Sequence, residues 1–296
     1  MTFGPTPRSA TVSFYGMSHS VRLASALDRT SSRYSARSVG APGATTNWAF
    51  GAFLRDQDKD KSRVAVLSVM AANLPMINTM GAMSWNSSFP LPYTSDRFVM
   101  RGGELRVVKP PYETFDDYAR ALGDDRRWQA AAKTFERFDP WYDPYLMRAS
   151  VLDHSALMRL LRRGYGLRQE RAARAGVLDG KTYHADSEQI LLANAIVANF
   201  AAKSRREGVI PVIFVINNYG YSNNLYRALR RTLERDHIPY LSSHTIVSPG
   251  DPRGYLPDSH FTDANDDRLA RALEEVVDAE LAKPVSAAEN PAFRAL

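Results

Sequence analysis

The sequence predicts an α/β fold in which helices flank a parallel sheet of five strands. Short runs rich in β-branched residues alternate with stretches of helical periodicity, an order of elements that is typical of parallel sheets. Several of these runs are continuously apolar, as strands buried on both faces are. With 296 residues, 44% of them hydrophobic, the chain can bury a substantial core as one large domain.

Five segments have the composition of strands, and most of them end in a glycine-rich or polar turn. The five segments are 11–15, 34–39, 63–70, 209–217 and 238–241. Apolar residues recur at helical spacing between and after them, which predicts helices over 21–27, 48–54, 225–235 and 266–281. The sheet is therefore expected to lie between two layers of helices.

Segment 74–150 interrupts this alternation with many aromatic residues, and we interpret it as an insertion within a single domain spanning 1–296. Gly102 and Gly103 predict a tight hairpin turn inside it. The aromatic side chains could form a lid or substrate wall, in which Trp85, Trp141 and Tyr142 are the candidates to contact a sugar ring or an acyl chain. The alternative is that these rings only build the core of the insertion.

Composition excludes several classes of function. The chain has 38 basic and 32 acidic residues, giving +6, but no nucleic-acid-binding motif accompanies its arginines, so we expect no nucleic-acid partner. The absence of cysteine excludes disulfides, cysteine-bound metals and thiol catalysis. No histidine has the spacing of a metal site, and there is no phosphate loop or dinucleotide fingerprint, so neither metal nor cofactor is expected.

No stretch approaches the roughly 18 consecutive apolar residues of a membrane span, and the first ten residues lack the apolar core of a signal peptide. These features predict a soluble chain without a transmembrane segment, cytoplasmic unless a leader has been removed. Oligomeric state is left open by the sequence.

Ser18 follows the first predicted strand, in the turn that leads into a helix. Enzymes built on parallel sheets carry their reactive groups at the carboxyl ends of the strands, so a nucleophile is expected in such a turn. The segment YGMSHS does not complete the G-x-S-x-G pattern of α/β-hydrolases, because Ser20 stands where the second glycine would be. The alternative is that Ser18 is only the N-cap of the helix that follows.

Asp258 and His260 lie in a loop just before the last predicted helix. A nucleophilic serine needs a base to accept its proton, and the base needs an acid group that fixes its tautomer. Asp258 and His260 can supply both, which makes them the candidate partners of Ser18. Alternatively, the pair is part of a helix-entry turn or lies on the surface.

These segments, in this order, resemble the blocks of the SGNH hydrolase family, the GDSL-type esterases and lipases. Gly16-Met17-Ser18 is similar to the block that carries the nucleophile, and Asp258 with His260 is similar to the block before the last helix. Gly43 and Asn73 stand where the family has its two further oxyanion-hole residues. The resemblance implies the flavodoxin-like, SGNH-type three-layer fold and an oxyanion hole formed by Ser18, Gly43 and Asn73.

A general physical argument supports the same oxyanion-hole role for these residue types. Attack on an ester carbonyl places negative charge on its oxygen, and each preorganised donor there contributes about 3 to 4 kcal/mol. The alternatives are that Gly43 serves a turn after Pro42 and that Asn73 caps the next element. His19 adjoins the nucleophile and is a candidate to contact substrate, although a solvent-exposed histidine at a helix start is the simpler expectation.

This chain departs from the family pattern at three points, which indicates a divergent member. Met17 replaces the usual aspartate, Ala71-Ala72-Asn73-Leu74 replaces Gly-x-Asn-Asp, and only one residue separates Asp258 from His260, where two are commoner. None of these changes removes a catalytic atom, but they weaken any inference about the substrate.

The sequence thus supports three hypotheses. The first is a cofactor-independent serine esterase that hydrolyses an acyl or acetyl ester, of a small molecule or a glycan, through an acyl-enzyme. The second is an O-acyltransferase that uses the same site on a glycan. The third is a non-catalytic binding protein that retains the scaffold, for which the missing block aspartates are the indication.

Overall fold

The computed structural model describes residues 10–81, 94–148 and 150–283. Contacts divide the chain into two compact units, which we describe separately. Unit 1 consists of residues up to Leu74 and from Ala193 onward, and unit 2 consists of Pro75–Leu192. Unit 2 contains all of the predicted insertion 74–150 except residue 74, and it also contains residues 151–192.

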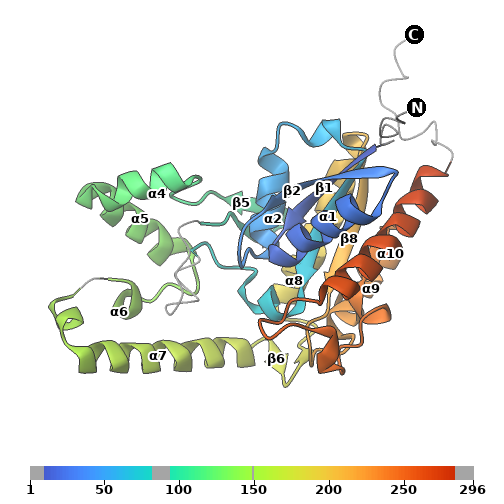
Figure 1. The fold of residues 1–296 in the computed structure, drawn as a ribbon. Coiled ribbons are helices and arrows are strands. Elements are labelled where there is room, and N and C mark those ends of the chain that lie inside the picture. Colours follow the sequence, from blue (N-terminus) through green and yellow to red (C-terminus); the bar gives the residue numbers. More distant parts are fainter. Residues whose placement is uncertain (1–9, 82–93, 149, 284–296) are drawn as a thin grey trace, which may run out of the picture. The chain divides into compact units, whose positions relative to one another are not determined.

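Unit 1 contains one sheet of five parallel strands in the order β2-β1-β3-β8-β9 (Figure 1). The strands are β1 (Ala10–Gly16), β2 (Tyr34–Gly40), β3 (Val64–Met70), β8 (Ile210–Ile216) and β9 (Tyr240–Ser242). The predicted α/β fold with a five-stranded parallel sheet is confirmed. All seven residues of β3 are buried, and all but Ser68 are apolar, as expected of a central strand.

Helices cover both faces of this sheet. They are α1 (Ser18–Thr30), α2 (Thr46–Arg55), α8 (Glu188–Arg206), α9 (Asn224–Arg235) and α10 (Asp263–Leu281). Short 3-10 helices lie at Lys59–Lys61, Ala71–Met76, Ser243–Thr245 and Pro252–Gly254. Helices α1 and α10 lie side by side on one face, where Arg22 binds Asp263 and Asp266 (Figure 1).

Alternation along the strands divides the core between the two faces. Phe14, Val66 and Phe214 belong to the same cluster of buried side chains as residues of α1 and α10. On the other face, the ring of Tyr15 packs edge-on against Phe53 of α2, and Phe53 packs in turn against Phe200 of α8. The two core layers hold the sheet between the helices and align the strand ends that carry the loops.

Unit 2 is mainly helical. Its helices are α4 (Phe115–Leu122), α5 (Asp125–Phe138), α6 (Pro144–Met147) and α7 (Ala156–Ala175), with a 3-10 helix at Val151–His154. Two antiparallel hairpins join β4 (Arg97–Arg101) to β5 (Glu104–Val108) and β6 (Leu178–Asp179) to β7 (Thr182–Tyr183). The first is the predicted hairpin, and Gly102 and Gly103 both have positive φ, at 59° and 82°.

Within the described residues, no helix is both long and apolar enough to cross a membrane.

Candidate active site

Ser18 is the first residue of α1, directly after the end of β1. The N-cap position is Met17, whose side chain is fully buried and makes no capping hydrogen bond. Gly16 is required where the chain turns, because a Cβ there would lie 2.1 Å from Ser20 Oγ. Ser18 is therefore not the N-cap, and its backbone N–H is among the first-turn amides that have no acceptor within the helix.

His260 connects Ser18 to Asp258. Its Nε2 lies 2.6 Å from Ser18 Oγ, and its Nδ1 lies 2.9 Å from Asp258 Oδ2. The hydrogen bonds from His260 lower the pKa of the Asp258 carboxyl, so Asp258 is ionised near neutral pH. An ionised carboxylate accepts the Nδ1 proton and leaves the Nε2 lone pair directed at the serine hydroxyl.

The short spacing between Asp258 and His260 depends on the intervening residue. Ser259 has a φ of 70°, in the left-handed region, and the backbone N–H of His260 donates to Asp258 Oδ1 at 3.2 Å. The aspartate side chain thus folds back over the turn and binds both the backbone and the ring of His260. This conformation explains how one intervening residue suffices where the resembled family commonly has two.

His19 is buried beneath His260, and the expectation that it is exposed to solvent is wrong. Its side chain is 5% exposed, and its ring stacks on that of His260 with 4.5 Å between the ring centres. Nε2 lies 3.2 Å from the Ser259 carbonyl, which can only accept, so Nε2 holds the proton and the buried Nδ1 has no hydrogen-bond partner. Burial lowers the pKa of His19 to about 4, and the electrostatic influence of His260 acts in the same direction.

Gly43 and Asn73 come from the loops after β2 and β3, the two neighbours of β1 in the sheet. Gly43 has a φ of 66° within a turn closed by a hydrogen bond from the Ala44 N–H to the Ala41 carbonyl at 3.1 Å. Asn73 Nδ2 donates to the Ala44 carbonyl at 3.3 Å. Asn73 lies inside the Ala71–Met76 helix, so it does not cap it, and its side chain is directed to the Gly43 loop.

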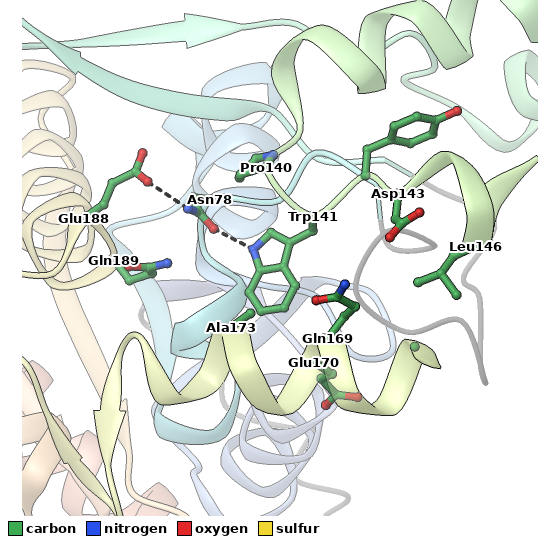
Figure 2. Close-up of a pocket in the computed structure, with 12 residues that line it drawn as sticks. Asn78, Pro140, Trp141, Asp143, Leu146, Gln169, Glu170, Ala173, Glu188 and Gln189 are labelled. Atoms are coloured by element: carbon green, nitrogen blue, oxygen red, sulfur yellow. Dashed lines mark hydrogen bonds between the residues drawn. The ribbon is translucent and has the colours of Figure 1, made fainter. Parts of the chain in front are cut away.

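The remaining predicted substrate contacts belong to unit 2. Trp85 lies outside the described residues. Trp141 and Tyr142 line a pocket of unit 2, in which the Trp141 indole N–H donates to Asn78 Oδ1 at 2.9 Å (Figure 2). Their contact with a substrate stays a prediction.

Fold and site together define a three-layer α/β protein with a serine–histidine–aspartate arrangement at the carboxyl ends of its strands. No protein-family model and no curated protein matches the chain. Among solved structures, it is similar to one described as a "putative lipolytic protein of G-D-S-L family" from Desulfitobacterium hafniense DCB-2. The two share 10% sequence identity with a TM-score of 0.41, over 90% of this chain and 99% of the other.

Sequence reasoning did not find that His19 supports the His260 loop. The signal available in the sequence was that His19 is adjacent to Ser18. This adjacency is the same whether the ring points inward or outward, so it does not predict that His19 is buried. Helix α1 begins at Ser18, and the burial of His19 depends on the position of the 258–260 loop next to this end of the helix.

Proposed function

We propose that this chain is a serine hydrolase that cleaves a carboxylic ester and is a divergent member of the SGNH family. The observation that carries the proposal is the continuous hydrogen-bonded path from Ser18 Oγ through His260 to Asp258. A packing role alone does not require a serine hydroxyl 2.6 Å from an imidazole nitrogen whose other nitrogen binds a carboxylate.

In the proposed reaction, Ser18 Oγ attacks the ester carbonyl while its proton passes to His260 Nε2. The tetrahedral intermediate collapses when His260 returns that proton to the departing alcohol, and Ser18 is left acylated. Water then attacks the acyl-enzyme, with His260 again as base, and releases the acid and the free serine. Asp258 holds the ring in position and stabilises its positive charge in both steps.

The oxyanion of each intermediate needs donors, and three groups are candidates. The Ser18 N–H lies at the start of α1, where the helix dipole also favours negative charge. The Gly43 N–H and the second hydrogen of Asn73 Nδ2 are the other two. The hydrogen bond between Asn73 and Ala44 supports this assignment, because it ties the asparagine to the loop that carries Gly43.

The decisive test is covalent labelling of the intact protein with a fluorophosphonate probe, combined with turnover of a short-chain aryl ester. Ser18→Ala should lose labelling, and both Ser18→Ala and His260→Ala should lower kcat by about 10³-fold or more. Ser25→Ala is the matched control, because Ser25 is exposed on the same helix and, among the described residues, its hydroxyl donates to the Val21 carbonyl of its own helix.

Three outcomes separate the candidate functions. Labelling that persists in Ser18→Ala, or a wild-type protein that neither labels nor turns over, contradicts the proposal, and the second result favours a binding protein. A wild-type protein that labels but releases product slowly until a glycan acceptor is added would instead be an O-acyltransferase with the same nucleophile.

A further inference from the structure

Unit 2 contains a cavity of about 420 Å³ between the loop that follows α5, helix α7 and the start of α8 (Figure 2). This volume lies within the range of about 300–1,000 Å³ that is usual for small-molecule sites. The cavity is lined by both aromatic and polar side chains, Trp141 and Tyr142 among them, and its lining does not include Ser18, Asp258 or His260.

The Trp141 ring is held rigidly at this cavity. Its indole N–H donates to Asn78 Oδ1, and Asn78 Nδ2 donates in turn to Glu188 Oε2 at 3.0 Å, as Figure 2 shows. Its backbone N–H donates at 3.0 Å to the buried carboxylate of Asp139, which also accepts from the Gly81 N–H. With its one polar atom satisfied at the ring edge, the indole offers a fixed apolar face to a ligand.

The charges around that ring have one sign. Asp143, Glu170 and Glu188 line the cavity, and no lysine or arginine is among the described lining residues. Their cationic or hydroxyl partners lie outside the lining: Tyr165 donates to Asp143, Arg174 to Glu170, and Arg97 lies 3.6 Å from Glu188. The carboxylates are thus fixed in place, and they do not gather into a group that could hold a metal ion within the described chain.

Gln169 and Gln189 add carboxamides to the same lining. Carboxamides and carboxylates present paired planar acceptors or donors, which match the adjacent hydroxyls of a sugar ring. An acyl chain would instead need predominantly apolar walls, and a phosphate or uronate would meet three carboxylates but no lysine or arginine in the described lining.

We propose that this cavity is a binding site for a saccharide of neutral or positively charged rings, with one ring stacked on Trp141. The carboxylates favour an amino sugar over a neutral one and exclude acidic polysaccharides. The described residues that line this cavity belong to unit 2, whereas Ser18 and His260 belong to unit 1.

Isothermal titration calorimetry on the full chain tests the proposal with three probes: a glucosamine tetramer, cellotetraose and tetragalacturonate. The glucosamine tetramer should bind most tightly, cellotetraose more weakly, and tetragalacturonate should give no heat of binding. Trp141→Leu should weaken binding of the glucosamine tetramer about tenfold, since it removes the flat ring but keeps an apolar side chain.

Two variants control for indirect effects. Trp141→Phe should retain most of the affinity, and Trp128→Leu should leave it unchanged, because Trp128 packs with Tyr118 in a separate aromatic cluster. Turnover of an aryl acetate by Trp128→Leu should equal that of wild type. The proposal is overturned if neither of the first two sugars binds at millimolar concentration, if the galacturonate binds best, or if Trp141→Leu binds like wild type.

Discussion

At the scale of single residues, His19 links the site to the stability of the fold. The ring is neutral above about pH 4, whereas in the unfolded chain it titrates near pH 6.5. Between these values the unfolded state binds more protons, so the contribution of His19 to stability falls as the pH falls. Three charged or titratable groups act electrostatically on His19: His260, whose ring stacks on it, Arg22 and Asp258.

We therefore predict that wild type loses stability relative to His19→Gln as the pH falls from about 6.5 to about 4. The difference in the free energy of unfolding should change by about 3 kcal/mol over this range. Urea unfolding at several pH values measures it. Burial raises the pKa of Asp266 to about 6, so its contribution to stability changes with pH in the opposite direction. This contribution is present in both proteins and cancels in the difference between them. Stability curves that stay parallel would show that His19 does not titrate in this way.

Asn73 should affect the transition state more than the binding of substrate. Because a donor to an oxyanion acts only once the charge has formed, Asn73→Ala should lower kcat by about 10²- to 10³-fold with little change in KM. Steady-state kinetics on an aryl acetate measure both parameters. A rise in KM at unchanged kcat would instead assign Asn73 to ground-state binding, and thermal unfolding would detect any loss of the Ala44 hydrogen bond.

At the scale of elements, the turn from β1 into α1 depends on the size of Gly16. A Cβ there would meet Ser20 Oγ at 2.1 Å and Ser68 Cβ at 2.8 Å, so Gly16→Ala should destabilise unit 1 by about 1–3 kcal/mol. Gly164→Ala is the contrasting variant: nothing lies within 4 Å of a Cβ there, inside α7, and the change should stabilise that helix by up to about 1 kcal/mol. Denaturant unfolding measures the change in the free energy of unfolding for each variant. Equal changes in Gly16→Ala and Gly164→Ala would contradict this prediction.

The sheet could be predicted from the sequence because its strands are short, apolar and separated by turns. The predicted strand over 63–70 differs from β3 by one residue, and Gly102 and Gly103 fixed the hairpin turn correctly. Helix α8 was not predicted, because its segment EQILLANAIVANF is apolar over much of its surface and its periodicity does not distinguish a helix from buried strands. Its Phe200 packs on α2, a contact visible only once the layers are assembled.

The site residues, too, divide into those that could be predicted from the sequence and those that could not. Ser18, Asp258 and His260 could be proposed because each lies at an element boundary in a recognisable order. The burial of His19 could not, because it results from a loop more than two hundred residues away in sequence, which contacts it through Ser259 and His260.

At the scale of the whole molecule, the two units differ in how much they bury. Every residue of β3 is buried, whereas Gly166 is the one buried residue of α7. We predict that hydrogen exchange will be slowest at the amides of β3 and β8 and much faster along α7, since local opening of α7 exposes little apolar surface. Mass spectrometry of peptic fragments after exchange measures this order, and equal protection of α7 and β3 would contradict it.

The pairing of β3 with β8 also has a consequence for biosynthesis. Val64 of β3 pairs with Ile210 of β8, so the ribosome makes all of unit 2 after β3 and before β8. During that interval one edge of β3, whose residues are apolar except for Ser68, has no partner, a state that favours aggregation or binding by a chaperone. In the proposed mechanism, Ser18 is synthesised 242 residues before His260, so a chain interrupted between them would carry the proposed nucleophile without its proposed base.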